Sequence, residues 1–451
     1  MAEVRPPPEA GFDVATQTLI IGAGACGLVA ALAAHEAGQE VLVIEADPVP
    51  RGSTALSAGL IPAAGTKAQG AAGIEDEPRR FAADIQAKAH DQNDPVLVQA
   101  MTDLAAPVID WLSEAYDVPF SVVTDFDYPG HSRRRMHGLP NRSGAALIDT
   151  LRALCEAQGI DILCGRRAET IFARDLHVHG VGVRGAGAES IGCDKLILAC
   201  NGFGGNRDMV ARNMPDIAQA VWFGHDGNRG EAIRWGAALG ADTRHLSAYQ
   251  GHGNVAHPHG ILITWAVITE GGIQVNANGV RFWNESQGYS EAARPVLAQP
   301  SGVAWTLFDG RCAAIARQFE DFKSAEAQGA VVVADTLAAL ADRLGLPVQA
   351  VCDTVETLAS GGQCSFGRMF SGPPLAPPFF GVKVTGALSH TQGGLVTDGT
   401  GRVRHQGGQG FDNLFAGGGA ACGVSGSGDA GYLSGNGLLS AVTLGFAAGK
   451  S

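Results

Sequence analysis

The sequence has few charged residues, and most of these are acidic. Asp and Glu number 45 against 32 Lys and Arg, the formal net charge is −13, and charged residues make up 17% of the 451 residues. The densest basic run is the three arginines at 133–135. A phosphate backbone repels an acidic chain that lacks a lysine or arginine stripe, so we expect no nucleic acid partner.

Long apolar runs and paired cysteines are missing too. No run reaches the roughly 18 apolar residues of a membrane span, and residues 1–11 lack the basic start and apolar stretch of a secretion signal. The nine cysteines contain no CxxC pair, and His257 and His259 have no carboxylate or cysteine at ligand spacing. We therefore expect no disulfide framework, no metal and a reduced, cytoplasmic setting.

Glycine, in contrast, is abundant. The chain has 63 glycines, about twice the usual share, which predicts many turns and close approaches of the backbone to a ligand. The apolar fraction of 45% is typical of a globular protein. A length of 451 residues suggests two or three folding units.

A nucleotide-binding pattern stands near the amino terminus. Residues 17–21 form an apolar strand, which runs into GAGACG at 22–27 and an alanine-rich helix to about residue 37. A second strand at 40–44 ends at Glu45. This order of strand, GxGxxG, helix, strand and acid predicts a dinucleotide-binding unit.

Each residue of this pattern has a physical task. Gly22 permits a tight turn, Gly24 lets a pyrophosphate approach the amino end of the helix, and Gly27 lets helix and strand pack closely. Glu45 can accept hydrogen bonds from a ribose.

The following segment favours a flavin. Residues 51–59, RGSTALSAG, form a small, hydroxyl-rich segment that suits a ring needing hydrogen-bond donors along one edge. No second GxGxxG unit with an acid is present, so a bound nicotinamide cofactor is not expected.

The rest of the chain predicts an α/β protein. The last 60 residues contain strands and glycine loops, and a proline-rich linker occupies 372–378. We expect a nucleotide domain made of residues 12–248 and 386–451, with a second domain inserted at 249–385. Other expected elements are helices at 96–116, 144–158 (capped by Ser143), 336–344 and 348–359, and a buried strand at 195–200.

Taken together, these motifs resemble the flavoprotein family of fumarate reductase, succinate dehydrogenase and the 3-ketosteroid dehydrogenases. The likeness covers about residues 15–450 and rests on GAGACG with Glu45, RGSTALSAG, LILACNGFGGN, NGVRFWNES, HTQGGLVTDGTGRV, and NLFAGGGAACG ending in YLSGNGLLSA. It implies a Rossmann-like FAD-binding domain of the glutathione-reductase type with an inserted α+β capping and catalytic domain. The cofactor-binding residues that it implies are Gly22, Gly24, Ala25, Cys26, Gly27, Glu45, Ala46, Ser53, Thr54, Ser57, Ala58, Gly59, Ala168, Asn201, Gly202, Gly418, Gly419, Asn436, Leu438 and Leu439.

Two departures from the family concern the flavin. Some members attach it covalently through a histidine after the ribose acid, where this chain has Gly52, Ser53 and Thr54, so the resemblance implies non-covalent FAD. The family often has a glutamate near Gly419 that contacts the ribityl chain, and this chain lacks it.

The resemblance also separates two branches of the family. Fumarate reductases use an arginine proton donor, a glutamate and arginine relay, and an arginine that clamps a carboxylate. The corresponding positions here are Tyr289, Trp265, Ile268 and Tyr432. Protonation of fumarate through arginine cannot proceed without these charges.

The replacements resemble ketosteroid dehydrogenases instead. Those enzymes use a tyrosine as base, a second to hold the ketone oxygen and a third to support the base, and Tyr289, Tyr432 and Tyr128 stand at these places. The chain has only five tyrosines, so three matches carry weight. Tyr432 to Gly435 also resembles the Tyr-x-Ser-Gly of the 5α-steroid branch, which adds Ser434 to the catalytic candidates and Gly435 to the substrate-binding ones.

The chemistry explains these residue types. Desaturation beside a ketone removes the α-proton and passes the β-hydrogen to the flavin as hydride, so donors must polarise the carbonyl. A tyrosine with its reference pKa of about 10 needs a partner that stabilises its phenolate.

Three further residues leave the substrate open. His252 and Thr264 resemble the fumarate reductase pair that grips one carboxylate, and His390 resembles the histidine on the other. They can bind a carboxylate or a carbonyl, or be structural histidines. His390 joins the catalytic candidates, and Trp265 joins His252, Thr264 and Gly435 in the expected substrate-binding set.

These inferences predict FAD-dependent α,β-dehydrogenation of a cyclic ketone, either a 3-ketosteroid or a small cyclohexanone or oxocyclohexanecarboxylate. The electrons then leave to an external acceptor: a quinone, an electron-transfer protein or oxygen. The alternatives are an enoate reductase of the fumarate type and a non-catalytic flavin-binding redox sensor.

Overall fold

A computed structural model describes residues 3–124, 128–185, 188–359 and 361–451 of the chain. The chain forms two compact units. Unit 1 comprises Met1–Met214, Gly224–Tyr249 and His390–Ser451, and unit 2 comprises Pro215–Phe223 and Gln250–Ser389. No helix in the described part of the chain combines the length and the apolar character that crossing a bilayer requires.

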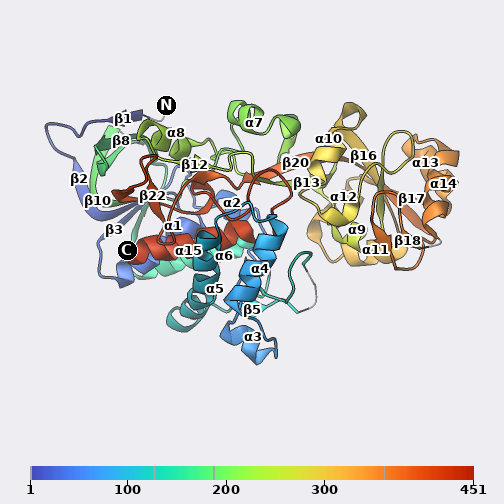
Figure 1. The fold of residues 1–451 in the computed structure, drawn as a ribbon, viewed down its shortest axis with the longest axis horizontal. Coiled ribbons are helices and arrows are strands. Elements are labelled where there is room, and N and C mark those ends of the chain that lie inside the picture. Colours follow the sequence, from blue (N-terminus) through green and yellow to red (C-terminus); the bar gives the residue numbers. More distant parts are fainter. Residues whose placement is uncertain (1–2, 125–127, 186–187, 360) are drawn as a thin grey trace. The chain divides into compact units, whose positions relative to one another are not determined.

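Unit 1 is built on a nine-stranded sheet (Figure 1). Its order is β1-β8-β9-β10-β2-β3-β7, and β23 pairs with both β10 and β22. The strands β23, β10, β2, β3 and β7 run parallel to their neighbours in this series, so their carboxyl ends meet at one edge. Their bounds are β1 Glu3–Arg5, β2 Val14–Ile21, β3 Val41–Ile44, β7 Asp161–Leu163, β8 Arg167–Arg174, β9 His177–Arg184, β10 Ala188–Leu198, β22 Arg402–Arg404 and β23 Gly410–Ala416.

The helices of unit 1 include those that the sequence predicts. The predicted cap of the helix at 144–158, which is α6 in the structure, is confirmed, since the Ser143 hydroxyl accepts a hydrogen bond from Ala146 N. The bounds are α1 Ala25–Glu36, α2 Gly52–Ala55, α3 Lys67–Ala71, α4 Pro78–Lys88, α5 Pro95–Ala115, α6 Gly144–Ala157, α7 Arg207–Asn213, α8 Glu231–Ala238 and α15 Asn436–Lys450. Smaller sheets pair β4 Ile61–Pro62 and β5 Ser121–Val122 with β6 Met136–Gly138, and β12 Thr243–Arg244 with β21 Gly394–Leu395.

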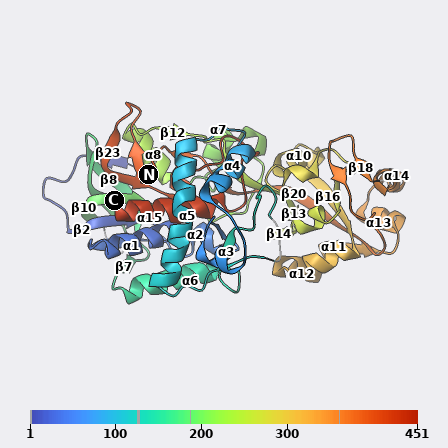
Figure 2. The ribbon, with the colours of Figure 1, turned by 60° about the horizontal axis from the view of Figure 1, so that its bottom comes forward.

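The helix α15 corrects the prediction of strands and glycine loops for the last 60 residues. It lies beside α1, and α5 packs across it (Figures 1 and 2). A Cβ at Gly445 would lie 2.5 Å from the carbonyl oxygen of Cys26, and one at Gly449 would lie 2.5 Å from that of Ala30. The glycines that suggested loops therefore let two helix backbones touch. Because α15 is buried on most sides, its sequence also lacks the one-sided apolar period that marks a surface helix.

Unit 2 is built on a seven-stranded sheet of order β14-β13-β20-β16-β15, with β11 and β17 also paired to β20. The predicted helices at 336–344 and 348–359 are confirmed as α13 and α14, and the Thr336 hydroxyl caps α13. The strands are β11 Val221–Trp222, β13 Tyr249–Ala256, β14 Ile261–Leu262, β15 Ile273–Val275, β16 Val303–Asp309, β17 Val331–Ala334, β18 Gly362–Gln363, β19 Met369–Phe370 and β20 Phe379–Thr391, and the helices are α9 Ala266–Thr269, α10 Ala293–Leu297, α11 Gly310–Ala316, α12 Glu320–Ala327, α13 Leu337–Leu344 and α14 Val348–Ala359.

The contact between α1 and α15 gives a testable prediction. Gly445→Ala places a methyl group against the Cys26 backbone, which cannot yield as a flexible side chain does. We expect a loss of about 1–3 kcal/mol, measured as a lower melting temperature. Gly70→Ala is the matched control, because it stands in helix α3 with open space around it and should gain up to about 1 kcal/mol. Equal melting temperatures for the two variants would contradict this packing.

Candidate active site

The amino end of α1 lies at the carboxyl edge of the sheet, and its N-cap residue Gly24 offers no side chain to cap it. Gly22 has a φ of +106°, and a Cβ on it would lie 2.5 Å from Ala199 O. A Cβ on Gly27 would lie 1.8 Å from Gly22 O, whereas the nearest atom to a Cβ on Gly24 is Thr54 Oγ1 at 3.9 Å. Gly24 has no capping side chain. Backbone contact on one side and open space on the other suit a phosphate group.

Glu45 is held at the end of β3 by backbone donors. Its two carboxylate oxygens accept hydrogen bonds from Ala23 N at 2.8 Å and Asp47 N at 2.9 Å. Its carbonyl accepts one from Arg166 N at 2.8 Å, which ties this turn to the start of β8 and to the buried Ala168. Each carboxylate oxygen keeps a lone pair for the hydroxyls of a ribose.

Ser53 lies at the centre of a cluster of three side chains. Its hydroxyl oxygen accepts hydrogen bonds from Asn201 Nδ2 at 2.8 Å and Asn228 Nδ2 at 3.0 Å. Both acceptor positions are therefore filled, and the hydroxyl proton is left to donate. The adjacent Thr54 accepts from Ala25 N at 3.3 Å. The predicted set lacked Asn228, whose sequence neighbours, Gly227 and Arg229, match no motif.

The rest of the hydroxyl-rich segment is structural in its contacts. It contains the short helix α2 rather than a loop alone. The Ser57 hydroxyl donates to Thr54 O at 2.7 Å and accepts from Gly59 N at 3.0 Å. The Ser57 carbonyl accepts from Gly144 N at 2.9 Å, which joins the segment to α6, and Ala58 is exposed.

The Asn201 side chain lies beside Gly419, the position near which the family often has a glutamate. A Cβ at Gly419 would lie 2.2 Å from Asn201 Oδ1. This oxygen accepts from Gly202 N at 2.8 Å, and a Cβ at Gly202 would lie 1.9 Å from Thr391 Oγ1. The Asn201 side chain occupies the space that a side chain at 419 would need. Gly418, the neighbouring candidate, has a φ of +56°.

A second open helix end belongs to α15. Its N-cap, Gly435, has a φ of +88° and no side-chain cap. The first helical residue, Asn436, is fully buried, and its Oδ1 has no hydrogen-bond partner in the described part of the chain. Leu438 is half-buried and Leu439 fully buried in the turn that follows.

These features fit FAD. Open helix ends can face phosphates or ring oxygens, Glu45 can face a ribose, and Ser53 and Asn436 supply a donor and an acceptor. Cys26 packs in the first turn of α1, and burial raises the pKa of its thiol to about 12, so it stays protonated.

Two candidate catalytic residues of unit 1, Tyr432 and His390, touch through their rings. Their centroids are 5.6 Å apart at an interplanar angle of 77°. Burial lowers the pKa of His390 to about 4, so the imidazole is neutral at pH 7. Tyr432 and Ser434 are both buried.

A second tyrosine–histidine pair stands in unit 2. The ring of Tyr289 stacks on that of His252 with centroids 5.2 Å apart and an interplanar angle of 26°. Gly253 N donates to Tyr289 O at 3.0 Å, which fixes the two segments side by side. Burial lowers the pKa of His252 to about 3. Its Nδ1 accepts from Asn254 N at 3.2 Å, so its proton is on Nε2.

Apolar side chains line one side of this pair. Trp265 and Ile268 are buried in one hydrophobic cluster, against which Tyr289 packs. The Trp265 ring meets His252 edge to face at 6.0 Å, and Thr264 Oγ1 accepts from Ala266 N at 3.4 Å. The positions that the resemblance aligns with a proton relay therefore carry no charge.

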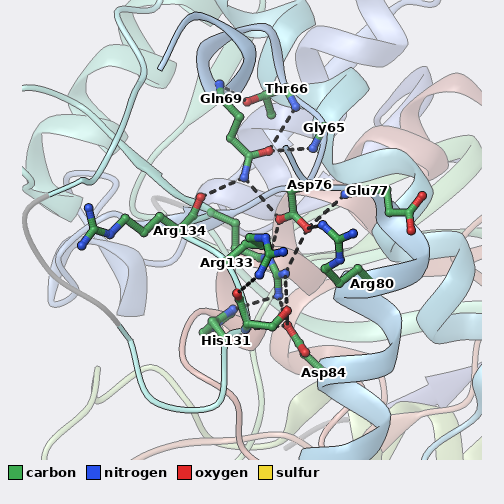
Figure 3. A network of polar contacts seen from close by, with 12 residues as sticks. Gly65, Thr66, Gln69, Asp76, Glu77, Arg80, Asp84, His131, Arg133 and Arg134 are labelled. Carbon is green, nitrogen blue, oxygen red and sulfur yellow. Dashed lines mark hydrogen bonds and ion pairs between the residues drawn. The ribbon is translucent and has the colours of Figure 1, made fainter. Parts of the chain in front are cut away.

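A buried ion network includes residues that follow Tyr128 in the sequence, and Figure 3 shows its members Asp76, Asp84 and His131. Of the arginines at 133–135, Arg135 alone is buried, and its guanidinium lies 4.6 Å from the Phe81 ring centroid. It donates from Nε to Asp76 Oδ2 at 2.9 Å and from Nη1 to Asp84 Oδ2 at 2.5 Å. One arginine of the basic run, Arg135, is therefore a buried structural residue, and the other two are exposed.

His131 connects this network to the final loop. Arg135 Nη1 lies 3.3 Å from His131 Nδ1, and an arginine can only donate. His131 Nε2 therefore carries the proton and donates to Ser434 O at 2.9 Å. Burial, and next the charge of Arg135, lower the pKa of His131 to about 4. Since His131 N donates to Tyr128 O at 3.2 Å, the turn of Tyr128 is joined to the loop of Ser434.

The structure thus groups the candidates by unit. Tyr128, Tyr432, Ser434 and His390 belong to unit 1, and Tyr289, His252, Thr264 and Trp265 to unit 2. The sequence prediction missed Arg135, His131 and Gln392. Arg135 and His131 act through contacts with residues far away in the sequence. Gln392 lies within the HTQGG motif, from which the prediction took only the histidine.

The buried His252 predicts a pH dependence of stability. Its folded pKa of about 3 lies below the unfolded value of about 6.5, so the unfolded chain takes up a proton first as the pH falls. The contribution to stability is present above pH 6.5 and lost toward pH 3. Between pH 7 and pH 5, we expect the melting temperature to fall less in His252→Gln than in the wild type, equivalent to at most about 2 kcal/mol. The exposed His259→Gln is the control and should follow the wild type. Parallel pH profiles of all three proteins would contradict this.

Comparison with known proteins also indicates a flavoprotein along almost the whole chain. The FAD binding domain family matches residues 17–438. A probable fumarate reductase of Shewanella frigidimarina is 32% identical over 98% of this chain and 75% of its own length. The NADH:fumarate oxidoreductase of Klebsiella pneumoniae is 28% identical over 98% of this chain and 48% of its own length. The 3-oxosteroid 1-dehydrogenase of Mycobacterium tuberculosis is 24% identical over 92% of this chain and 94% of its own length.

Solved structures share the fold. A flavocytochrome c3 fumarate reductase in an open conformation superposes with a TM-score of 0.83 at 29% identity, over 98% of this chain and 78% of that one. A 3-ketosteroid Δ4-(5α)-dehydrogenase from Rhodococcus jostii superposes with a TM-score of 0.79 at 24% identity, over 99% of both. The predicted fold class and the predicted cofactor are confirmed. The chain belongs to the FAD binding domain family and is an FAD-dependent oxidoreductase of the fumarate reductase and ketosteroid dehydrogenase group.

Proposed function

We propose that the protein desaturates a cyclic ketone between its α and β carbons. The observation that carries this proposal is that Tyr289 and Tyr432 each pack against a histidine whose pKa burial lowers far below 7. Neutral imidazoles offer N–H donors without positive charge, and Trp265 and Ile268 add an apolar wall. A carbonyl oxygen is well served by such donors, whereas a dicarboxylate needs cations to offset its desolvation.

Each candidate residue has a role in this reaction. Tyr289 accepts the α-proton, and its stacking on His252 in an apolar surrounding keeps water from the base. Tyr432 donates to the carbonyl oxygen, with the N–H of His390 and the hydroxyl of Ser434 as further donors. Tyr128 stabilises the phenolate of the base. His252, Thr264, Trp265 and Gly435 contact the substrate.

The cofactor residues hold FAD without a covalent bond. Gly22, Gly24 and Gly27 place the pyrophosphate at α1, Glu45 binds the ribose, and Ser53 donates to the ring. Bound FAD supplies the hydride acceptor of the reaction. The electrons leave to an external acceptor, which is a quinone, an electron-transfer protein or oxygen.

An enoate reductase of the fumarate type is the second candidate. It is favoured by the relatives of Shewanella and Klebsiella and by the retained His252, Thr264 and His390. One panel separates the two. Purified enzyme with an artificial acceptor is offered steroids, cyclohexanones and oxocyclohexanecarboxylates, with mass spectrometry of the products. In the reverse arm, reduced dye is offered fumarate. Ketone-dependent dye reduction supports desaturation, fumarate-dependent dye oxidation supports the second candidate, and no turnover in either arm leaves a flavin-binding sensor.

The first prediction from this proposal concerns flavin attachment. Ser53 stands in the segment where covalent members have a histidine, and it cannot form that bond. Acid precipitation should release all the flavin into the supernatant, measured by absorbance. Yellow colour that stays with the protein pellet would refute non-covalent binding.

The second prediction concerns the tyrosines. Tyr289→Phe keeps the ring and removes the hydroxyl, so flavin content should survive while turnover falls by roughly 10²–10⁴. Tyr432→Phe should lower turnover by about 10²–10³. The two effects should not multiply, because both residues serve one step. Tyr116→Phe is the control, since Tyr116 packs edge to face on Trp111 at the end of α5 and should leave turnover unchanged.

An exchange measurement isolates the base. With the flavin reduced, the wild type should wash deuterium from solvent into the α-position of the ketone, and Tyr289→Phe should not. Ketone dehydrogenation by Tyr289→Phe at near wild-type rate would remove Tyr289 from the role of base.

A further inference from the structure

A chain of buried polar side chains runs from α15 to His390. Asn436 Nδ2 donates to Ser425 Oγ at 3.1 Å, and Ser425 Oγ donates to Gln392 Oε1 at 3.0 Å. Gln392 Nε2 then donates to His390 Nδ1 at 2.8 Å. Asn436, Ser425 and Gln392 are 0%, 1% and 5% exposed. Water therefore does not satisfy these groups, and each depends on its neighbour in the chain.

The backbone holds Gln392 at this place. Its N–H donates to Ala248 O at 2.8 Å, and its carbonyl accepts from Gly423 N at 2.8 Å. The ring of His390 lies against α15, because a Cβ on Gly437 would be 3.1 Å from Nε2 and 2.9 Å from Cε1. Neither end of the side-chain link can move far, so the link is a fixed feature of the site.

The number of available protons fixes the donor and the acceptor in each of these hydrogen bonds. The Ser425 hydroxyl has one proton, so accepting from Asn436 obliges it to donate to Gln392 Oε1. The Gln392 amide then presents its NH₂ group to His390, and Nδ1 must accept. If both amides turned over, every bond would reverse and Nδ1 would carry the proton, with Thr391 O at 3.3 Å as a second acceptor. The orientation of the Asn436 amide thus decides which ring nitrogen of His390 is protonated.

The helix terminus favours the first direction. Asn436 is the first residue of α15, where the helix presents free N–H groups and partial positive charge. In the first direction the amide atom left without a partner is the oxygen, which this positive end stabilises. In the reverse direction the unpaired group would be an NH₂, which the same end repels.

We propose that Gln392 is a positioning residue that fixes the proton of His390 on Nε2, so that a neutral N–H faces the substrate oxygen. This inference rests on the proposed function only for the identity of that oxygen. No described residue hydrogen-bonds to Nε2, and the titratable side chain that packs against the ring is Tyr432. With Nε2–H and the Tyr432 hydroxyl as donors, unit 1 polarises a carbonyl with two neutral groups.

Nitrogen NMR of protein labelled with ¹⁵N-histidine tests the tautomer without any substrate. The resonances of His390 are identified by their loss in His390→Gln. In the wild type, both without flavin and loaded with FAD, we expect Nε2 to be protonated and Nδ1 unprotonated at neutral pH. A protonated Nδ1 in the wild type overturns the proposal, whatever the enzyme turns out to oxidise.

Two variants test the role of Gln392 itself. In Gln392→Glu the carboxylate can only accept, so the proton should move to Nδ1. In Gln392→Met the side-chain length is kept and the link is lost, so both tautomers should be seen. Gln409→Glu makes the same change on an exposed turn and should leave the His390 signals of the wild type. An unchanged Nε2 tautomer in Gln392→Glu would assign its fixation to other contacts and overturn the proposal.

A further variant covers the case in which Gln392→Glu does not fold. Ser425→Ala breaks the chain one step away and frees the Gln392 amide to turn. A mixture of tautomers supports the role of the hydrogen bonds from Asn436 through Ser425 and Gln392, and a pure Nε2 tautomer contradicts it. Flavin absorbance and melting temperature show whether each variant is folded. A wild type with the expected tautomer but without ketone turnover would refute the proposed function and leave the proposal for Gln392 intact.

Discussion

The structure of unit 1 depends on places where two backbone segments touch because a glycine puts no side chain between them. Gly27 lies against the carbonyl of Gly22, which lies against the end of β10, and Gly445 lies against the carbonyl of Cys26. These contacts bring the amino end of α1 to the carboxyl ends of the parallel strands, and they pack α15 alongside α1 in the same direction. A phosphate or a ring oxygen can then meet unpaired N–H groups, because no Cβ stands in the way.

Burial determines the charge state of the candidate site. Removing an imidazole from water disfavours the imidazolium, and this lowers the pKa of His252 to about 3 and those of His131 and His390 to about 4. The buried charge of Arg135 is held in ion pairs with Asp76 and Asp84, and Arg80 also pairs with Asp76. A site of neutral donors is suited to polarise a carbonyl, and this is the physical basis for choosing a ketone over a dicarboxylate.

The sequence predicts the elements whose signals are local. The strand, GxGxxG, helix and acid around Gly22 to Glu45 follow from spacing, and α13 and α14 follow from their apolar period. The helix α15 does not, because its buried faces erase that period and its glycines suggest loops. Asn228 and Arg135 act through partners far away in sequence, Ser53 and Asp76 among them, and no local pattern marks such pairs. The contact between Asn201 and Gly419 likewise joins residues far apart in sequence.

Three histidines of the candidate site, His131, His252 and His390, share one feature, since each accepts a hydrogen bond at Nδ1 and so keeps its proton on Nε2. The donors differ in one respect that matters. His131 faces an arginine and His252 faces a backbone N–H, and neither of these groups can turn an acceptor toward the ring. His390 faces the amide of Gln392, which carries a donor at one end and an acceptor at the other. Its tautomer is therefore the one of the three that can reverse without movement of the backbone. Its direction must be imposed from outside, and the unpaired Oδ1 of Asn436 at the positive end of α15 is the group that imposes it.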